Sequence, residues 1–527
     1  MYDVIIKNGT VIDGTGSRAV RADIAVDGEK IKKIANLKNE EAKLTIDAEN
    51  LYVTPGFIDL TTHSDSHWTL FSHPNQESFL MQGITTILGG HGGSSLAPII
   101  NKESIGSIEK WLEPSDININ WQTLEQFFSE LSKHNLKINF GTLTGHETLR
   151  RNILKNQVRR AKNEEIKEMA NLLAQSLNEG SFGLSTNLGS LHGQAASDSE
   201  IDALLQTVTQ NNGTSMHHME DEGKNLLPAL SRIITFLRTT RVKGHIAHLK
   251  AIGRMAWEYF DNALSMIENA RKEGVQITCD FYPYTRTGSN MSSLLPSWAL
   301  LGNEEKVMSL FKNEVSRKNL KNHFKELTLH YNKITVASAQ HSANSVGKTL
   351  KEISEMSGLT PEDVILQLLE INNLRVSIFN EVLLEKNIEN LSAKPYSMIA
   401  SDGVGYDLSK IKDSGSDLAH PRSFGAFPKA INWFVKQKKS LSWEDMIYKM
   451  SGLPAATLGL EKRGALKEDH YADIIIFNPQ EIKDTATYEN PFSYSKGIKF
   501  VFVNGVLTIA EDKLKNDKSG GKIIKKE

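Results

Sequence analysis

The middle of the chain alternates short apolar runs with longer stretches whose apolar residues recur every three or four positions. One such stretch predicts a helix over Glu164–Leu177, and the run Phe182–Ser185 after it predicts a strand. Ser197 and Glu200 then form a capping-box pattern that opens the next helix. The alternation continues to about residue 280, which is typical of repeated strand and helix units.

The ends of four consecutive predicted strands fall at a regular interval. Ser185, His218, His248 and Asp280 are 33, 30 and 32 residues apart, the size of one strand with its return helix, which favours parallel strands. Four further strands bring the total to eight and predict a (β/α)8 barrel of the TIM type, in the α/β class: Phe57–Thr62, Ile84–Gly89, Ile138–Gly145 and Ser397–Ser401. Residues from about 285 to 393 are too many for one crossover, so we expect a helical insertion there that acts as a lid.

Both ends of the chain read as β structure instead. The first fifty residues contain short β-branched runs separated by Asn-Gly and Asp-Gly turns, and another Asn-Gly, at 504–505, follows a similar run. We therefore expect the two ends to form one sheet. Residues 513–527 are rich in Lys and Gly without periodicity and predict a solvated tail.

Composition narrows the class of protein. The 527 residues include 61 basic and 63 acidic ones, so no excess charge points to nucleic acid or a membrane surface as a partner. The single cysteine, Cys279, excludes an intramolecular disulfide framework and a multi-cysteine metal cluster. Without a long apolar run or a signal-peptide pattern, we expect a cytoplasmic protein. Nothing in the sequence indicates its oligomeric state.

The predicted strand ends carry the residues most suited to chemistry, because a TIM-type barrel places its active site at the carboxyl ends of its strands. Although the chain has only 16 histidines, these ends hold His63, His91, His146, His218, His248, Asp280 and Asp402. Imidazole and carboxylate groups are zinc ligands, and catalytic zinc uses three protein ligands and a water molecule. The pattern therefore favours a metal site, with a packing role as the alternative for each single histidine.

Runs of residues along nearly the whole chain resemble the N-acyl-D-amino-acid deacylases (D-aminoacylases) of the amidohydrolase superfamily. The run Pro55–Asp65 resembles the first metal motif of that superfamily. The other similar runs follow in order: Gly83–Pro98, Gly145–Arg150, Gly183–Thr186, His218–Gly223, His248–Lys250, Asp280–Tyr284, Ser401–Gly403, His420–Arg422 and Ala472–Ile474.

The resemblance implies a domain plan and roles for single residues. A metal-dependent hydrolase barrel would cover residues 56–455, and a small β-sandwich would form from residues 1–55 and 456–512. His218 and His248 match the histidine ligands of the tightly held zinc, and Asp402 matches the aspartate that shuttles protons. The substrate carboxylate would meet a pocket formed by Lys250, Tyr282, Tyr284 and Arg422.

Three positions depart from the family pattern. Thr61 stands where the first motif has a histidine, so only His63 remains of the pair that builds a second metal position. His91 stands where close relatives have a metal-ligating cysteine, and imidazole can replace thiolate at zinc. Glu220 stands where the family has an arginine. The first two departures favour a weak second position at His63 and one tightly bound zinc, held by His91, His218 and His248.

The implied activity is hydrolysis of the amide bond of N-acyl-D-amino acids to a carboxylate and a free D-amino acid. Zinc would activate water and polarise the carbonyl, while Asp402 takes up a proton and returns it to the leaving nitrogen. The alternatives are a dihydropyrimidinase-like or β-aspartyl dipeptidase-like amidohydrolase, or a binding protein on the same barrel that has lost catalysis. The two-metal enzymes commonly use a carboxylated lysine, but His146 and Ser185 stand at the third and fourth strand ends.

Overall fold

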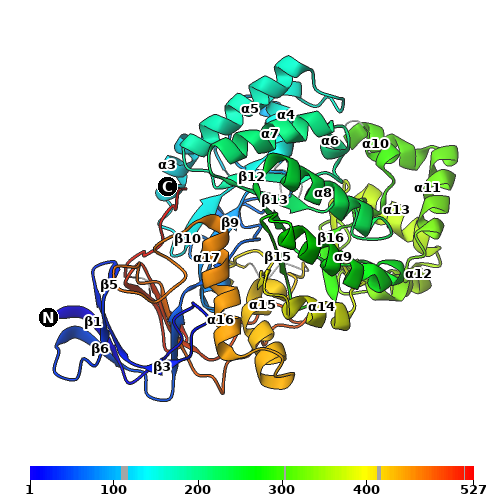
Figure 1. Cartoon of the computed structure of the whole chain (residues 1–527). Helices are drawn as coiled ribbons and strands as arrows, with labels where there is room; N and C mark the ends of the chain where they lie inside the picture. The colour runs from blue at the N-terminus through cyan, green and yellow to red at the C-terminus, as the bar shows by residue number, and fades with distance from the viewer. Residues whose placement is uncertain (108–116, 302–303, 412–416, 516, 527) are drawn as a thin grey trace.

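The computed structural model describes residues 1–107, 117–301, 304–411, 417–515 and 517–526. Its centre is a ring of parallel strands with helices outside (Figure 1). In order around the ring the strands are β8 (Phe57–Asp59), β9 (Ile84–Gly89), β10 (Asn139–Thr142) with β11 (Thr144–Gly145), β12 (Gly183–Asn187), β13 (Thr214–His218), β14 (Lys243–Ile246), β15 (Ile277–Phe281) and β19 (Ser397–Ile399). The predicted (β/α)8 class is confirmed.

The first and last strands of the ring meet just beyond their carboxyl ends. The Asp402 main-chain N–H donates to the Thr61 carbonyl at 2.9 Å, and the His63 N–H donates to the Gly403 carbonyl at 2.8 Å. These bonds bring loops that are about 340 residues apart in sequence to one rim of the barrel. Side chains on both loops therefore face the same space.

Amphipathic helices cover the outside of the ring, because each has one apolar face to bury against the strands. The helices predicted after residues 163 and 197 are confirmed as α5 and α7, and Ser197 Oγ caps α7 by accepting the Glu200 N–H at 3.2 Å. The covering helices are α1 (Thr69–Ser72), α2 (Glu77–Leu80), α3 (Leu124–Ser132), α4 (His146–Leu154), α5 (Asn163–Asn178), α6 (Leu191–Gln194), α7 (Asp198–Gln210), α8 (Leu226–Thr240), α9 (Arg254–Lys272), α14 (Glu385–Ser392), α15 (Arg422–Ala430), α16 (Trp443–Met450) and α17 (Gly452–Leu458). Among the described residues, no helix combines the length and the apolar character that a membrane crossing needs.

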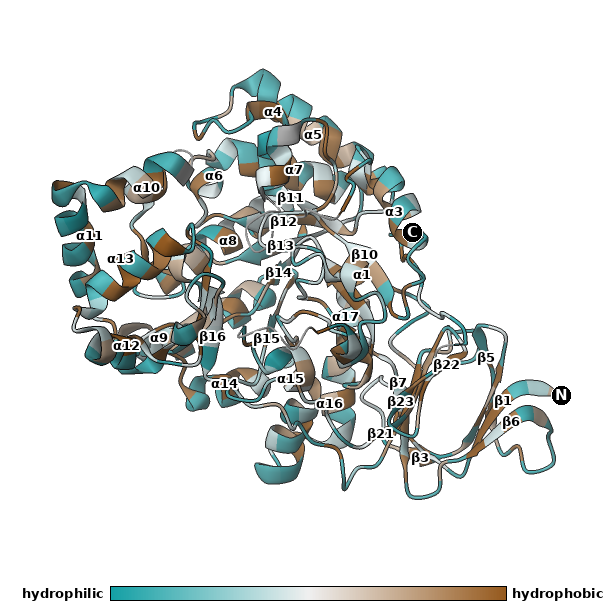
Figure 2. Ribbon diagram, turned by 180° about the vertical axis from the view of Figure 1, so that it is seen from behind, coloured by the Kyte–Doolittle hydropathy of each residue, from teal (hydrophilic) through white to brown (hydrophobic). Residues whose placement is uncertain are grey.

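Two sheets at one end of the molecule enclose a separate apolar core. One has the order β5-β4-β1-β6 and the other the order β23-β22-β21-β20-β7-β2-β3, which joins both ends of the chain as expected. Figure 2 shows the apolar residues of these strands between the two layers. The strands are β1 (Tyr2–Lys7), β2 (Thr10–Val11), β3 (Val20–Arg21), β4 (Asp23–Asp27), β5 (Lys30–Ala35), β6 (Ala42–Asp47), β7 (Tyr52–Pro55), β20 (Ile474–Phe477), β21 (Ile498–Val503), β22 (Val506–Ala510) and β23 (Lys513–Leu514).

The insertion between β15 and β19 is not purely helical, so that prediction is wrong in part. Its helices α10 (Glu304–Lys312), α11 (Glu314–Glu326), α12 (Leu350–Ser357) and α13 (Pro361–Ile371) pack on an antiparallel sheet of order β16-β18-β17. The sheet strands are β16 (Arg286–Asn290), β17 (Ile334–Ala339) and β18 (Val376–Glu381). Residues 302–303 of the predicted insertion lie outside the described residues.

The prediction of a solvated tail over residues 513–527 is also wrong in part: most of its described side chains are exposed, but its main chain is bound to the barrel. Phe140 of β10 donates its N–H to the Lys522 carbonyl at 2.9 Å and accepts the Ile524 N–H at 2.8 Å. The Lys526 N–H then donates to the Gly180 carbonyl, just before β12, at 3.0 Å. Main-chain hydrogen bonds do not depend on whether a side chain is polar or apolar, so the sequence pattern does not reveal them. Here they fix the segment to the barrel although its composition is hydrophilic.

Candidate functional site

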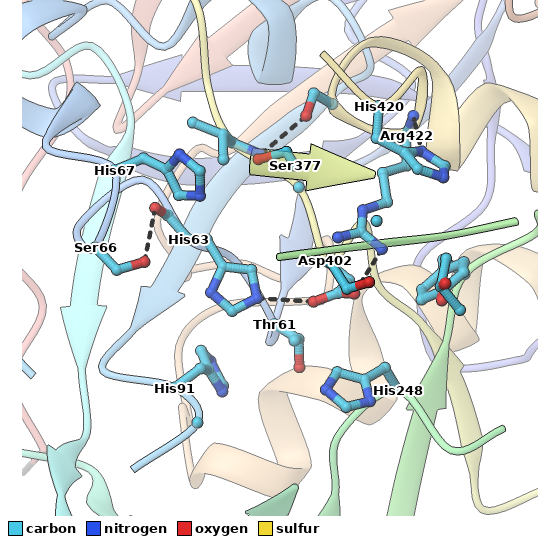
Figure 3. Close-up of a pocket in the computed structure, with 18 of the residues that line it drawn as sticks. Thr61, His63, Ser66, His67, His91, His248, Ser377, Asp402, His420 and Arg422 are labelled. Atoms are coloured by element: carbon cyan, nitrogen blue, oxygen red, sulfur yellow. Dashed lines mark hydrogen bonds and ion pairs between the residues drawn. The ribbon is translucent and has the colours of Figure 1, made fainter. Parts of the chain in front are cut away.

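A cavity of about 290 Å³ opens at the carboxyl ends of the barrel strands. Figure 3 shows His63, His91, His248 and Asp402 arranged around Thr61 in this cavity. Residues of β16, β17 and β18 line its other side, so the insertion forms one of its walls. The predicted site residues on the cavity wall are His63, His91, His218, His248, Lys250, Tyr282, Asp402 and Arg422.

Tyr284 is the predicted site residue that the structure places elsewhere. It lines a second hollow of about 470 Å³ with Lys429 and Asp484, and the Lys429 Nζ lies 5.0 Å from the centroid of its ring. The chain turns at Pro283, so the alternation that would put Tyr282 and Tyr284 on one face of a strand is lost. Of these two tyrosines, only Tyr282 therefore lines the cavity.

His218 and His248 come from neighbouring strands and face each other. β13 ends at His218, and β14 ends two residues before His248, whose φ of 39° turns the chain at the rim. His218 Nδ1 lies 2.9 Å from His248 Nε2, and the two ring centroids are 4.5 Å apart. Desolvation, with the neighbouring His248, lowers the pKa of His218 to about 3, so its ring is neutral and keeps a lone pair for a cation.

A carboxylate and an amine stand behind this pair. Glu222 Oε1 lies 3.2 Å from His248 Nδ1 and accepts from Lys250 Nζ at 2.6 Å, while Lys250 Nζ lies 2.7 Å from His248 Nδ1. Burial acts to raise the Glu222 pKa, but Lys250 and the two imidazoles lower it to about 2. The carboxylate is ionised at neutral pH, and Lys250 neutralises it.

His91 stands on the other side of Thr61. It follows β9 in the turn Gly90-His91-Gly92, where Gly90 has a φ of 77° and a side chain on it would collide with the Leu143 carbonyl. The His91 ring lies 6.3 Å from the His63 ring, and its buried Nε2 has no hydrogen-bond partner. Desolvation lowers the His91 pKa to about 3, which leaves a neutral imidazole.

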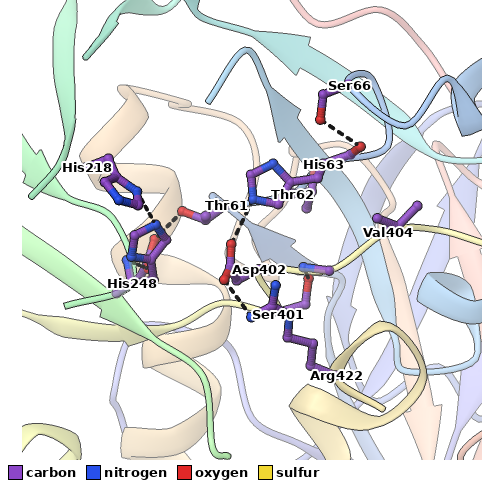
Figure 4. A network of polar contacts seen from close by, with 12 residues as sticks. Thr61, Thr62, His63, Ser66, His218, His248, Ser401, Asp402, Val404 and Arg422 are labelled. Atoms are coloured by element: carbon purple, nitrogen blue, oxygen red, sulfur yellow. Dashed lines mark hydrogen bonds and ion pairs between the residues drawn. The ribbon is translucent and has the colours of Figure 1, made fainter. Parts of the chain in front are cut away.

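Asp402 links the first and last strands of the ring through its side chain (Figure 4). Its Oδ1 lies 2.8 Å from His63 Nε2, and its Oδ2 lies 2.7 Å from Arg422 Nη1. Burial favours the neutral acid, but Arg422, His248 and His63 hold the Asp402 pKa well below its usual value. Asp402 is therefore an ionised carboxylate inside a cavity rich in imidazole.

Two residues at the far side of Asp402 have donor atoms without hydrogen-bond partners. The Arg422–Asp402 contact is an ion pair with poor hydrogen-bond angles, so Nε and Nη1 of Arg422 are buried without a hydrogen-bond acceptor. The Tyr282 hydroxyl is buried without one too, and the Arg422 guanidinium lies 4.9 Å from the Tyr282 ring centroid. Unpaired buried donors are costly, so this corner suits an anionic or carbonyl group of a ligand.

Other polar residues at the strand ends have partners outside the cavity. His146 pairs with Glu200 at 2.7 Å next to Arg150, which is a packing role. Glu220, the reversed charge, forms an ion pair with Arg232 of α8 at 2.7 Å. His217 is buried against Thr186, as expected if only one of the two adjacent histidines faces the cavity.

The residues described by the structure fit a divalent metal. One group of three His, Cys, Asp or Glu side chains has ligand atoms within 4.8 Å of one another among the described residues, namely His218, Glu222 and His248. The sequence interpretation did not assign Glu222 a role, although it stands four residues after His218. The loop after β13 brings it back beside His248, a fold that residue spacing alone does not reveal.

Comparison with known proteins agrees with this geometry. The profile of the amidohydrolase family matches residues 411–509. D-aminoacylase of Alcaligenes xylosoxydans xylosoxydans is 28% identical over 504 residues, covering 96% of this chain and 94% of that protein. Among solved structures, a D-aminoacylase with a binuclear metal centre superposes with a TM-score of 0.83 at 26% identity, over the full length of both chains.

A further solved structure shares the fold. It is the N-acyl-D-glutamate deacylase of Bordetella bronchiseptica in complex with zinc and a phosphonate inhibitor, at a TM-score of 0.84, 23% identity and 99% coverage of both chains. The similarity in sequence and fold extends over the barrel, the insertion and the sandwich together. The chain is therefore similar over nearly its whole length to D-aminoacylase and to the N-acyl-D-aspartate and N-acyl-D-glutamate deacylases, and its residues 411–509 match the amidohydrolase family.

Proposed function

We propose that this protein is a zinc-dependent amidohydrolase that cleaves N-acyl-D-amino acids to a carboxylate and a free D-amino acid. One observation carries the proposal: neutral imidazoles, the ionised Asp402 and the unpaired donors of Arg422 and Tyr282 face a single cavity at the barrel rim. The amide specificity and the D configuration are supported by the relatives named above. The proposal leaves the side chain and the acyl group of the substrate unspecified.

We assign the metal to the nitrogens that face the cavity. His218 Nδ1 and His248 Nε2 would hold zinc, with His91 Nε2 as the third ligand because it is buried and has no other partner. Glu222 contacts the opposite nitrogen of His248, the usual position of a carboxylate that orients a ligand rather than one that binds the metal. A bound zinc ion would act as a Lewis acid on the amide carbonyl and lower the pKa of water.

We propose one tightly bound zinc. At a second position, His63 and Asp402 stand without a second histidine, since residue 61 is threonine and its hydroxyl already donates to Asp280. Too few fixed ligands are left there for tight binding.

Asp402 is placed to move the proton. Because its pKa is held low, it is ionised before substrate binds and can accept a proton at Oδ1 or Oδ2. The same low pKa makes it a weak base, so it gives the proton up readily to the leaving nitrogen. Arg422 and His63 keep the carboxylate in place through contacts of 2.7 and 2.8 Å.

Arg422 and Tyr282 are the groups that we expect to bind the substrate carboxylate. Their unpaired donors would each gain an acceptor, which offsets the cost of leaving them buried. Lys250 also lines the cavity, but its charge is already balanced by Glu222 at 2.6 Å. Lys250 would therefore contribute less to binding of the substrate carboxylate than its position in the sequence suggests.

A hydrolysis panel with matched metal analysis tests the function. The protein should hydrolyse N-acyl-D-amino acids faster than their L enantiomers and their methyl amides, and His218→Ala or His248→Ala should lose both zinc and activity. His341→Ala, which changes an exposed histidine of the insertion, is the control. Zinc retained in full by both cavity variants would refute the assignment.

The third ligand and the stoichiometry need a separate measurement. After mild chelation, elemental analysis should find one zinc per chain in the wild type. Glu222→Gln should also retain one zinc per chain, although it binds the ion more weakly, whereas His91→Ala should retain less than one. More zinc retained by His91→Ala than by Glu222→Gln would show that Glu222, and not His91, is the third ligand. Two zinc ions retained by the wild type would contradict the single-zinc proposal.

A further inference from the structure

Asp280 is a carboxylate at the centre of the barrel rim that the proposed reaction does not use. It is completely buried at the end of β15, and within the part of the chain that the structure describes it forms no ion pair with a Lys or Arg. Its Oδ1 accepts the His248 main-chain N–H at 2.5 Å. Its Oδ2 accepts from Thr61 Oγ1 at 2.5 Å and lies 2.8 Å from His245 Nε2.

The hydrogen-bond chain around His245 supports an ionised Asp280. His245 Nδ1 lies 2.8 Å from the Thr278 hydroxyl, so a neutral ring that accepts from Thr278 presents its Nε2–H to Asp280. Burial acts against a charge here, so the carboxylate depends on the donors that reach it from His245, Thr61 and His248. A buried charge of this kind is retained only where every contact is satisfied, so each of its three donors matters.

His248 needs such a support. With a φ of 39° it lies in the left-handed region, which residues other than glycine seldom adopt unless the surrounding structure holds them there. Its main-chain N–H is fixed by Asp280, and this conformation turns the imidazole toward His218. Glu222 and Lys250 contact His248 at Nδ1, and Lys250 Nζ also donates to the His248 carbonyl at 3.3 Å, so Asp280 is the group that holds the main-chain N–H.

We infer that Thr61 and Asp280 are positioning residues for the metal site: the Thr61 hydroxyl holds Asp280, and Asp280 holds His248 in its strained, metal-facing conformation. Figure 4 shows Thr61 between the His218–His248 pair and the His63–Asp402 pair. The residue that departs from the histidine of the family motif thus supports the first metal position through a hydrogen bond. The inference rests on the proposed function for the identity of the metal that His248 binds.

The alternative is that Thr61 and Asp280 only satisfy each other in the core. Neighbouring Thr62 offers a matched control, because it is equally buried and its hydroxyl donates to the Leu88 carbonyl at 2.8 Å instead. Thr61→Val and Thr62→Val each remove one buried hydroxyl of the same shape. A packing role predicts that both variants lose stability and that neither changes the metal site.

Metal affinity and geometry decide between the two. In competition with a chromogenic chelator, Thr61→Val should bind zinc about 10- to 100-fold more weakly, the usual effect of losing an outer-shell contact, while Thr62→Val and Thr61→Ser stay near wild type. The visible spectrum of the cobalt-substituted protein should change in Thr61→Val alone. Equal affinities and spectra in the two valine variants would overturn the inference.

A measurement on metal-free protein separates this inference from the proposed function. With selective ¹⁵N-histidine labelling, the His248 amide proton should resonate far downfield because it donates to a carboxylate. It should move upfield in Thr61→Val and not in Thr62→Val, whether or not zinc is the natural metal. An unmoved resonance in Thr61→Val would overturn the positioning role, whereas a wild type that binds no metal would overturn the proposed function.

Discussion

Asp402 combines burial with a full negative charge, which only its neighbours make possible. It has a φ of 50° just after β19, so its side chain leaves the strand direction and meets both His63 and Arg422. An uncompensated carboxylate in such a place would take up a proton. His63 and Arg422 prevent this protonation, so Asp402 stays ionised and can accept a proton in the cavity.

Asp402→Asn should keep the fold and the zinc but lower kcat by about two orders of magnitude or more, the usual effect of losing a positioned acid or base. An amide has the same shape but cannot accept the proton. The measurement is steady-state hydrolysis with elemental analysis of each preparation. Asp484→Asn, which changes a carboxylate paired with Lys429 outside the cavity, is the control and should turn over normally. Normal turnover in Asp402→Asn would show that the proton moves through another group.

The histidines at the strand ends could be found from sequence because the repeat of about 30 residues fixes where each parallel strand stops. That reasoning reached His63, His91, His218, His248 and Asp402, and all of them line the cavity. It did not reach Glu222 and misplaced Tyr284, because both depend on how a loop turns after its strand. Loop conformation is set by contacts with other elements, and no local residue pattern encodes it. Their roles, like those of the other site residues, stay predictions.

The sheet of the insertion is the wall that shapes the substrate end of the cavity. Ala337 of β17 and Ile378 and Phe379 of β18 line it, and Gly288 of β16 lies against the His420–Arg422 corner. A Cβ on Gly288 would come within 3.3 Å of His420 Cδ2 and 3.5 Å of Arg422 Nη2. The absence of a side chain there leaves the space in which Arg422 can meet a ligand.

Gly288→Val should therefore raise KM for N-acyl amino acids by about tenfold or more, since a single misplaced methyl group in a pocket has effects of this size. We expect a smaller change in kcat, because Asp402 and the histidines are untouched. Ser357→Val, which changes an exposed residue of α12 in the same insertion, is the control and should leave KM unchanged. An unchanged KM in Gly288→Val would mean that substrate does not reach this wall.

Helices and barrel strands were predictable because their residues carry a period that local geometry imposes. The 3.6-residue period gave α5 and α7 nearly to the residue. β16, β17 and β18 were missed, since their paired residues lie 37 or more positions apart in the sequence and their pairing is decided by the tertiary structure. An antiparallel sheet inside a helical segment gives too weak a local pattern to be separated from loop.

Residues from three remote parts of the chain meet at the end of the barrel opposite the cavity. Asn504, in the turn between β21 and β22, donates through Nδ2 to Asn139 of β10 and to the Gly520 carbonyl, each at 2.7 Å. Its Oδ1 accepts from Arg463 Nη2 at 2.8 Å. One buried amide thus ties the sandwich, the barrel and the segment 517–526 together.

Ile524→Ser should lower the resistance of the protein to heat and to protease. Ile524 packs on a core cluster under the barrel, and losing a half-buried isoleucine costs about 1 kcal/mol. Differential scanning calorimetry and limited proteolysis would measure the effect, with activity at low temperature unchanged. Lys518→Ser, whose side chain is exposed in the same segment, is the control. A variant as stable as that control would show that the segment is held by its main chain alone.

The bond between Phe140 and the segment 522–524 has a consequence for synthesis. The free edge of β10 finds its partner only after about 380 more residues have been made, which takes about 20 to 80 s at ordinary translation rates. During that time the nascent chain carries an unpaired strand edge that can pair with another chain. The yield of correctly folded protein should thus depend on chaperones and on temperature during expression, even though the finished molecule hides this edge completely.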